Sequence, residues 1–307
     1  MPETLLDRRR SLIGLAACWF GLSAAAAAAA AEVVAGVPAA GSASAPALTA
    51  ELLKTGLYLI SGGGGNSLLR LSQSGAVLVD GKAPGQYRAL MAQIRRISRL
   101  SDLPVRVLIA SNHHDAHAGN AQQFMAAGVA LIAQQNTRRR LPPGVERDDS
   151  AKATGRVVVF DRAYQLHIGG VDVNLYHFGP AHTDNDVLVH FPDLRVVALG
   201  ELVSVGAPVP DYAGGGRLLG WGPVLGQVLQ LDVDLVVPGS GPVMSRADLA
   251  GFKARVDALS ARATGLVKQG VAKDRLLQQL SADDPAWSAG GLAAVLDPLF
   301  AELSAAP

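Results

Sequence analysis

The stretch VLIASNHHDAHAGN, residues 107–120, joins an apolar run to a dense polar cluster. The apolar part predicts a buried strand that ends where the cluster begins. Residues 111–120 hold three histidines, one aspartate and two asparagines. Imidazole and carboxylate groups are metal ligands, and loops held at strand ends are where chemistry usually lies. The stretch therefore predicts a metal site at the end of a core strand.

The composition is that of a compact globular protein. The chain has 307 residues, of which 49% are hydrophobic and 17% are charged. Its 27 basic and 26 acidic side chains give a net charge of +1, and no block of Lys and Arg alternates with aromatic residues. The charge pattern therefore argues against nucleic-acid binding.

Residues 1–31 have the pattern of an export signal. Three arginines, residues 8–10, precede an apolar, alanine-rich run that ends in small residues. Paired arginines followed by Ser-Leu-Ile favour the twin-arginine route, so we expect a periplasmic or secreted protein without stable membrane insertion after cleavage. An uncleaved membrane anchor and a lipoprotein processing site at Cys18 are the alternatives. Cys18 is the only cysteine, so a mature chain that begins near residue 31 would have no thiolate ligand.

The remaining chain predicts one domain. Residues 32–50 are rich in Pro, Gly, Ser and Ala and read as a linker, and residues 51–307 as a single domain. Short β-branched runs alternate with helical spacing, for example over residues 83–98 and 245–270. Because the strands and helices recur in two similar halves, we expect an α/β fold, an αββα four-layer sandwich.

Five stretches occur in an order that resembles the metallo-β-lactamase superfamily. They are VLVDG (77–81), VLIASNHHDAHAGN (107–120), HFGPAHTDNDVLVHFP (177–192), VVALGELV (196–203) and LVVPGSGPV (235–243). The likeness covers nearly the whole chain after the linker and implies the same four-layer fold.

The resemblance also implies positions for metal ligands, because that family uses seven ligands for two zinc ions. His114, His117 and His182 stand at ligand positions with the family's residue type, and Glu201 replaces the bridging aspartate. Three positions are altered: Asn112 stands for the first histidine, Ala116 for the aspartate and Ser240 for the last histidine.

These losses predict one zinc ion rather than two. His114, His182 and Glu201 could hold that ion, with help from His117 and with Asn112 as a weak amide ligand. The second ion would lack two of its ligands, because alanine has no donor and a serine hydroxyl is a poor zinc ligand at pH 7. Catalysis would rest on Glu201, and on Asp115 if it replaces the lost carboxylate.

Other polar residues are candidates for supporting roles. Asp80, Asp184 and Asp186 match positions that brace the metal loops, although each could equally be a plain turn carboxylate. His113 is expected to support the site or lie at the surface. The segment from Tyr212 to Trp221 resembles one that lines the substrate side, so we expect Tyr212, Arg217 and Trp221 to contact a substrate.

Three functions remain open. The first is a hydrolase in which a metal-bound hydroxide attacks an ester, lactone, thioester or amide of a small molecule. The second is a non-catalytic binding protein that has kept the fold and lost the metal chemistry. The third is a different metal function, such as a non-haem iron oxygenase with two histidines and a carboxylate.

Overall fold

A computed structural model describes residues 47–98, 104–141, 156–203, 208–283 and 290–306. The expected export signal and most of the expected linker, residues 1–46, lie outside these ranges. None of the helices within them combines the length and the apolar character needed to cross a bilayer.

The strands within the described ranges form two sheets. The first has the order β1-β2-β3-β4-β5-β6-β7, and the second has the order β13-β12-β11-β10-β9-β8. The first sheet comprises β1 (Thr49–Lys54), β2 (Leu57–Ser61), β3 (Ser67–Ser72), β4 (Gly75–Val79), β5 (Val105–Ile109), β6 (Ala130–Gln134) and β7 (Val157–Phe160). The second comprises β8 (Ala163–Ile168), β9 (Val171–Tyr176), β10 (Leu188–Phe191), β11 (Val196–Gly200), β12 (Leu235–Pro238) and β13 (Met244–Ser245).

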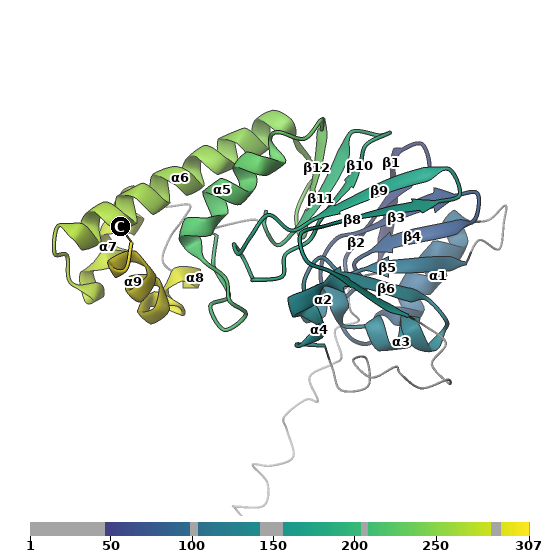
Figure 1. The fold of residues 1–307 in the computed structure, drawn as a ribbon, viewed down its shortest axis with the longest axis horizontal. Coiled ribbons are helices and arrows are strands. Elements are labelled where there is room, and N and C mark those ends of the chain that lie inside the picture. The colour runs from purple at the N-terminus through teal and green to yellow at the C-terminus, as the bar shows by residue number, and fades with distance from the viewer. Residues whose placement is uncertain (1–46, 99–103, 142–155, 204–207, 284–289, 307) are drawn as a thin grey trace, which may run out of the picture. The chain divides into compact units, whose positions relative to one another are not determined.

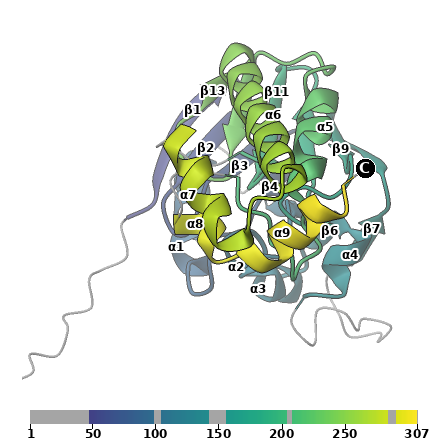
Figure 2. The same ribbon diagram turned by 90° about the vertical axis from the view of Figure 1, so that its left-hand side faces the viewer.

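Helices cover the outer face of each sheet (Figures 1 and 2). Those on or beside the first sheet are α1 (Tyr87–Ile97), α2 (Asp115–Ala118), α3 (Ala121–Ala126) and α4 (Gln135–Arg138). Those on the side of the second are α5 (Leu218–Val228), α6 (Arg246–Lys268), α7 (Lys273–Asp283), α8 (Gly290–Ala293) and α9 (Leu296–Ser304).

Three apolar layers hold the sandwich together. Alternate strand residues point to opposite faces, so Leu69 and Leu78 pack toward α1 and α3, while Leu68 and Val77 pack between the sheets. Across that middle layer the second sheet contributes residues such as Val189. A third layer packs the outer face of the second sheet against α5 and α6. The predicted αββα architecture is confirmed.

Two parts of the chain differ from the sequence-based prediction. β1 begins at Thr49, inside the expected linker, because it pairs with β2 from Thr49 to Lys54. The helices α7, α8 and α9 were not predicted as separate elements. They pack on the second half of α6 in a fourth apolar cluster that includes Leu276 and Leu299.

Candidate metal centre

The predicted polar segments meet at the carboxyl ends of the strands. β4 runs parallel to β5 in the first sheet, and β11 runs parallel to β12 in the second. Asp80 follows β4, residues 111–117 follow β5, and Glu201 follows β11. Because the carboxyl ends of parallel strands lie at one edge of a sheet, these segments converge at that edge.

The carboxylate of Glu201 lies at the centre of the cluster. Its Oε2 is 2.6 Å from Nδ1 of His114 and 3.1 Å from Nε2 of His182. Nε2 of His117 is 3.5 Å from the same oxygen. The ligand atoms of His114, His182 and Glu201 all lie within 4.8 Å of one another. The three predicted imidazoles and the acid therefore converge on one point.

Asp80 orients His117 through the ring nitrogen that does not face Glu201. Oδ2 of Asp80 is 2.8 Å from Nδ1 of His117, and the same carboxylate accepts hydrogen bonds from the N–H and hydroxyl of Ser111 at 2.8 and 2.9 Å. These contacts keep Asp80 in a left-handed conformation with φ of 65°. Nε2 of His117 is buried, has no hydrogen-bond partner among the described residues and faces Glu201.

His182 is oriented by its backbone surroundings. Its Nδ1 lies 3.0 Å from the carbonyl oxygen of Val209, and a carbonyl can only accept, so Nδ1 carries the proton of the neutral ring. Nε2 then presents its lone pair to the centre of the cluster. The rings of Trp221 and His182 pack in an edge-to-face arrangement, with centroids 5.9 Å apart.

The protonation of these groups is coupled. Burial raises the pKa of Glu201, but the contacts with His114, His117 and His182 outweigh it and hold the pKa well below its ordinary value. The hydrogen bond to Glu201 raises the pKa of His114. Burial lowers the pKa of His117 and His182, but the nearby carboxylates raise it by more. The ionised acid thus draws protons onto the imidazoles, and a bound cation would displace those protons.

The three altered ligand positions differ in the atoms that they could present to a metal ion. Asn112 accepts the backbone N–H of His114 on Oδ1 at 2.9 Å and donates from Nδ2 to Glu201 Oε2 at 2.8 Å. The amide donor therefore faces the cluster, and a ligand role for Asn112 stays a prediction. Ala116 carries no donor atom, and Ser240 is exposed after β12. Asp115 is exposed at the start of α2 and belongs to neither group of possible ligands among the described residues.

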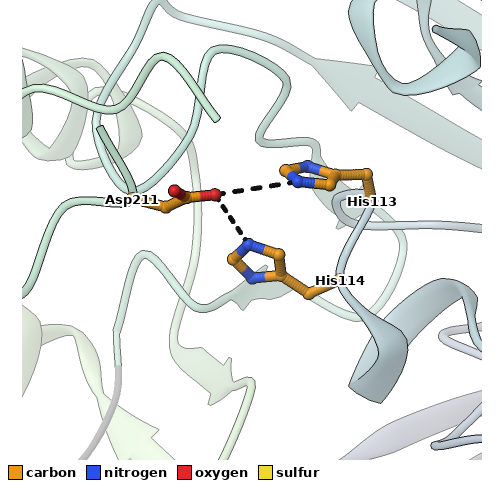
Figure 3. A group of neighbouring side chains, drawn as sticks. All are labelled: His113, His114 and Asp211. Carbon is orange, nitrogen blue, oxygen red and sulfur yellow. Dashed lines mark hydrogen bonds and ion pairs between the residues drawn. The ribbon is translucent and has the colours of Figure 1, made fainter. Parts of the chain in front are cut away.

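Asp211 is a member of the cluster that the sequence analysis missed. Its Oδ2 lies 3.0 Å from Nε2 of His114 and 3.7 Å from Nε2 of His113 (Figure 3). The ligand atoms of these three residues also lie within 4.8 Å of one another. The one local signal is the run of glycines at 214–216, which lets the N–H of Gly214 reach Oδ1 of Asp211 at 2.9 Å.

Two of the predicted supporting carboxylates brace the segment around His182. Asp186 accepts the backbone N–H and the hydroxyl of Thr183 at 2.9 and 2.6 Å. Asp184 forms a bidentate pair with Arg140 at 2.7 and 3.0 Å. Both carboxylates therefore fix the backbone on the carboxyl side of His182.

The predicted substrate residues lie in two places. Tyr212 donates its hydroxyl to Oε2 of Glu302 in α9 at 2.7 Å, and Arg217 Nε is 3.5 Å from Oε1 of the same residue. Tyr212, Arg217 and Glu302 line a cavity of about 240 Å³. Trp221 is buried and donates from Nε1 to the carbonyl of Leu202 at 2.8 Å. A substrate contact by any of these residues stays a prediction.

Comparison with known protein families identifies the family of this chain. The model of the metallo-beta-lactamase superfamily matches residues 60–240, more than half of the chain. The chain belongs to the metallo-β-lactamase superfamily. The match includes every residue of the cluster around Glu201, whereas α6 to α9 lie beyond it.

Two curated relatives match the chain at low identity. The chain is 24% identical over 234 residues to the 2,4-dinitroanisole O-demethylase subunit alpha of Nocardioides sp. (strain JS1661), covering 74% of this chain and 67% of that protein. It is 30% identical over 142 residues to metallo-beta-lactamase IND-1 of Chryseobacterium indologenes, covering 45% of this chain and 54% of that protein. The second match thus spans about half the length of its relative.

Solved structures support the fold. A metallo-beta-lactamase from Pontibacter korlensis has a TM-score of 0.56 at 20% identity and covers 68% of this chain and 99% of its own. The metallo-beta-lactamase IND-7 has a TM-score of 0.56 at 24% identity, with 68% of this chain and 98% of its own covered. The αββα fold of this chain is therefore that of the superfamily.

The donor set fits the zinc ion that is typical of this superfamily. Imidazole nitrogen and carboxylate oxygen are zinc ligands, and a catalytic site needs three of them with one position open. His114, His182 and Glu201 supply three, and the unpartnered Nε2 of His117 faces the same point. Glu201 is also 30% exposed on its side chain, which leaves the centre open to solvent.

Proposed function

We propose that this protein is an exported, metal-dependent hydrolase of the metallo-β-lactamase superfamily that uses one zinc ion and acts on a small-molecule ester, lactone, thioester or amide. The observation that carries the proposal is the convergence of His114, His117 and His182 on Oε2 of Glu201 at 2.6, 3.5 and 3.1 Å. The two relatives, a dinitroanisole demethylase subunit and a β-lactamase, have names that refer to small molecules. Export rests on the pattern of residues 1–31.

His114, His182 and Glu201 would hold the ion. When bound, zinc supplies a Lewis acid that polarises a carbonyl group and acidifies water at neutral pH. Both effects favour attack of water on a carbonyl group.

The residues around the ligands set their proton positions. The carbonyl of Val209 keeps a proton on Nδ1 of His182, so that Nε2 remains a lone-pair donor. Oδ2 of Asp211 can likewise hold a proton on Nε2 of His114, which leaves Nδ1 for the centre. Asp80 performs the same task at Nδ1 of His117. Once a bound cation has displaced the remaining protons, each imidazole would present one unprotonated nitrogen to the same point.

Metal analysis and turnover test the proposal together. Purified protein is analysed for bound zinc and iron, and is then assayed on a panel of esters, lactones, thioesters and amides, with and without chelator. We expect about one zinc per chain and chelator-sensitive hydrolysis. Glu201→Gln should reduce hydrolysis by about tenfold or more and weaken zinc binding to His114 and His182, because it removes a ligand charge. The exposed Glu51→Gln on β1 is the matched control.

Two results of these assays would favour another substrate class or another metal function. The panel includes 2,4-dinitroanisole, and turnover of that aryl ether without turnover of any carbonyl compound would contradict the proposed substrate class. Bound iron in place of zinc would favour the oxygenase class.

One observation favours the second candidate, a non-catalytic binding protein. Glu201 already receives hydrogen bonds from Asn112 and from the imidazoles, so the carboxylate is satisfied by protein groups. A protein that holds no metal after incubation with zinc and shows no turnover would support this candidate and end the hydrolase proposal.

A further inference from the structure

His114 faces a second group of ligand atoms on its other ring nitrogen. Nδ1 points to Glu201, whereas Nε2 lies 3.0 Å from Oδ2 of Asp211. Nε2 of His113 lies 3.7 Å from the same oxygen (Figure 3). We call His113, His114 and Asp211 the outer group, and His114, His182 and Glu201 the inner group. The two groups share only His114.

Each ligand of the outer group is oriented by a second contact. Nδ1 of His113 lies 3.2 Å from Oδ1 and 3.1 Å from Nδ2 of Asn185, and Oδ1 also accepts the backbone N–H of His113 at 3.1 Å. Oδ1 of Asp211 accepts the N–H of Gly214 at 2.9 Å. Contacts of this kind, which engage the far atom of each ligand, orient the side chains of metal sites. The near atoms are Nε2 of both histidines and Oδ2 of the aspartate.

The spacing of the near atoms is compatible with coordination of an ion as well as with the hydrogen bond between His114 and Asp211. At 3.7 Å, the contact between His113 and Asp211 is too long for a hydrogen bond. Ligands about 2.0 to 2.2 Å from a tetrahedral ion lie roughly 3.3 to 3.6 Å apart, and the two contacts of Asp211 bracket that range. The three side chains are 15, 27 and 25% exposed, so a further ligand could enter from solvent.

Gly214 leaves room for this arrangement. A Cβ atom at position 214 would collide with Oδ2 of Asp211 and would lie 2.9 Å from Cε1 of His113. Gly214 makes no use of a left-handed conformation, so close approach is the reason for a residue without a side chain here. Any larger residue would enter the space between the near atoms.

We propose that the outer group is a second binding position for a first-row transition ion. Two imidazoles and one carboxylate favour zinc or cobalt over magnesium or calcium, which prefer oxygen ligands. The position depends on Asp211 and His113, which are not among the ligands expected from the family resemblance. It goes beyond the proposed hydrolase function, in which the inner group holds the ion and Asp211 is not a ligand. A neutral His114 has one lone pair, so filling both positions at once requires loss of its remaining ring proton.

A cobalt titration with the inner group disabled tests the proposal. Glu201→Gln and His182→Gln are combined, and Co²⁺ binding is followed by visible absorption and calorimetry. We expect one equivalent to bind. Adding Asp211→Asn or His113→Gln should raise the Kd about tenfold or more. Exposed residues of β8 and β9 provide the matched controls, Asp172→Asn and His167→Gln, which should leave the Kd unchanged.

Two results would overturn the proposal. One is a double variant that stays folded and binds no Co²⁺. The other is a Kd that Asp211→Asn and His113→Gln leave unchanged. If the double variant does not fold, the same comparison is made with Glu201→Gln alone. The inner group is disabled in every variant of this test. If wild-type protein is found to hold no metal and the hydrolase proposal fails, the outer group can therefore still be tested.

Discussion

Glu302 in α9 ties the C-terminal helices to the segment that carries Asp211. Its side chain is 6% exposed, and Oε2 accepts the hydroxyl of Tyr212 at 2.7 Å and the N–H of Leu218 at 3.0 Å. Oε1 accepts the N–H of Leu219 at 3.2 Å. The carboxylate thus caps the first turn of α5, where the helix dipole favours negative charge. We expect Glu302→Ala to lower the free energy of unfolding by about 3 to 5 kcal/mol.

The magnitude follows from these contacts. A hydrogen bond to a charged group contributes roughly 1.5 to 3 kcal/mol, so three such bonds set an upper range of about 5 to 9 kcal/mol. The cavity of about 240 Å³ beside Glu302 admits water, which can solvate part of what the substitution exposes. Glu302→Gln keeps the shape and one acceptor oxygen but loses the charge, so it should lower the unfolding free energy by about half as much.

Urea unfolding followed by circular dichroism measures both variants. Tyr212→Phe and the Tyr212→Phe/Glu302→Gln double variant complete a cycle, in which we expect a coupling of about 1 kcal/mol or more. The exposed Glu51→Gln is the control and should change stability by less than about 0.5 kcal/mol. A loss of unfolding free energy below about 1 kcal/mol for Glu302→Ala, or no coupling with Tyr212, would refute this stabilising role of Glu302.

Two further predictions concern a buried lysine and the altered ligand positions. Burial lowers the pKa of Lys82 from 10.5 to about 8. Since the unfolded chain then keeps this proton longer than the folded one, stability should rise by about 3 kcal/mol between pH 8 and 10.5. In urea unfolding, Lys82→Met should remove that rise, whereas the exposed Lys54→Met should keep it. An equal dependence of the unfolding free energy on pH in the two variants would contradict the expected shift in the pKa of Lys82. The triple variant Asn112→His, Ala116→Asp and Ser240→His should raise bound zinc toward two per chain by elemental analysis, and unchanged zinc would mean that these residues are aligned wrongly with the family ligands.

The C-terminal helices connect the proposed chemistry to a part of the chain outside the family match. The model of the superfamily ends at residue 240, whereas Glu302 holds Tyr212, the neighbour of Asp211. A change in the packing of α9 would therefore move Asp211 relative to His114. We expect Glu302→Ala to weaken Co²⁺ binding by the outer group as well as stability.

Much of the fold was predictable because it depends on local periodicity. The alternation of apolar residues in 67–72 and 75–79 sends neighbouring side chains to two different buried faces. The helical spacing of Leu90 and Ile94 gives α1 one buried side. The start of α6 is marked in the sequence by the capping pair of Ser245 and Asp248. These features need only residues that are close in sequence.

The sequence by itself determined most strands and the main helices, because periodicity is carried by neighbouring residues. The order of its motifs resembles the family, and that resemblance implied which side chains gather near Glu201. Only the tertiary structure decided that Asp211 reaches His114 across 97 positions and that Glu302 reaches Tyr212 across 90. It also decided that Asn112 turns its donor, rather than its oxygen, toward Glu201. Such contacts depend on how separate loops and helices pack, and a carboxylate in a loop has no periodic pattern that names its distant partner.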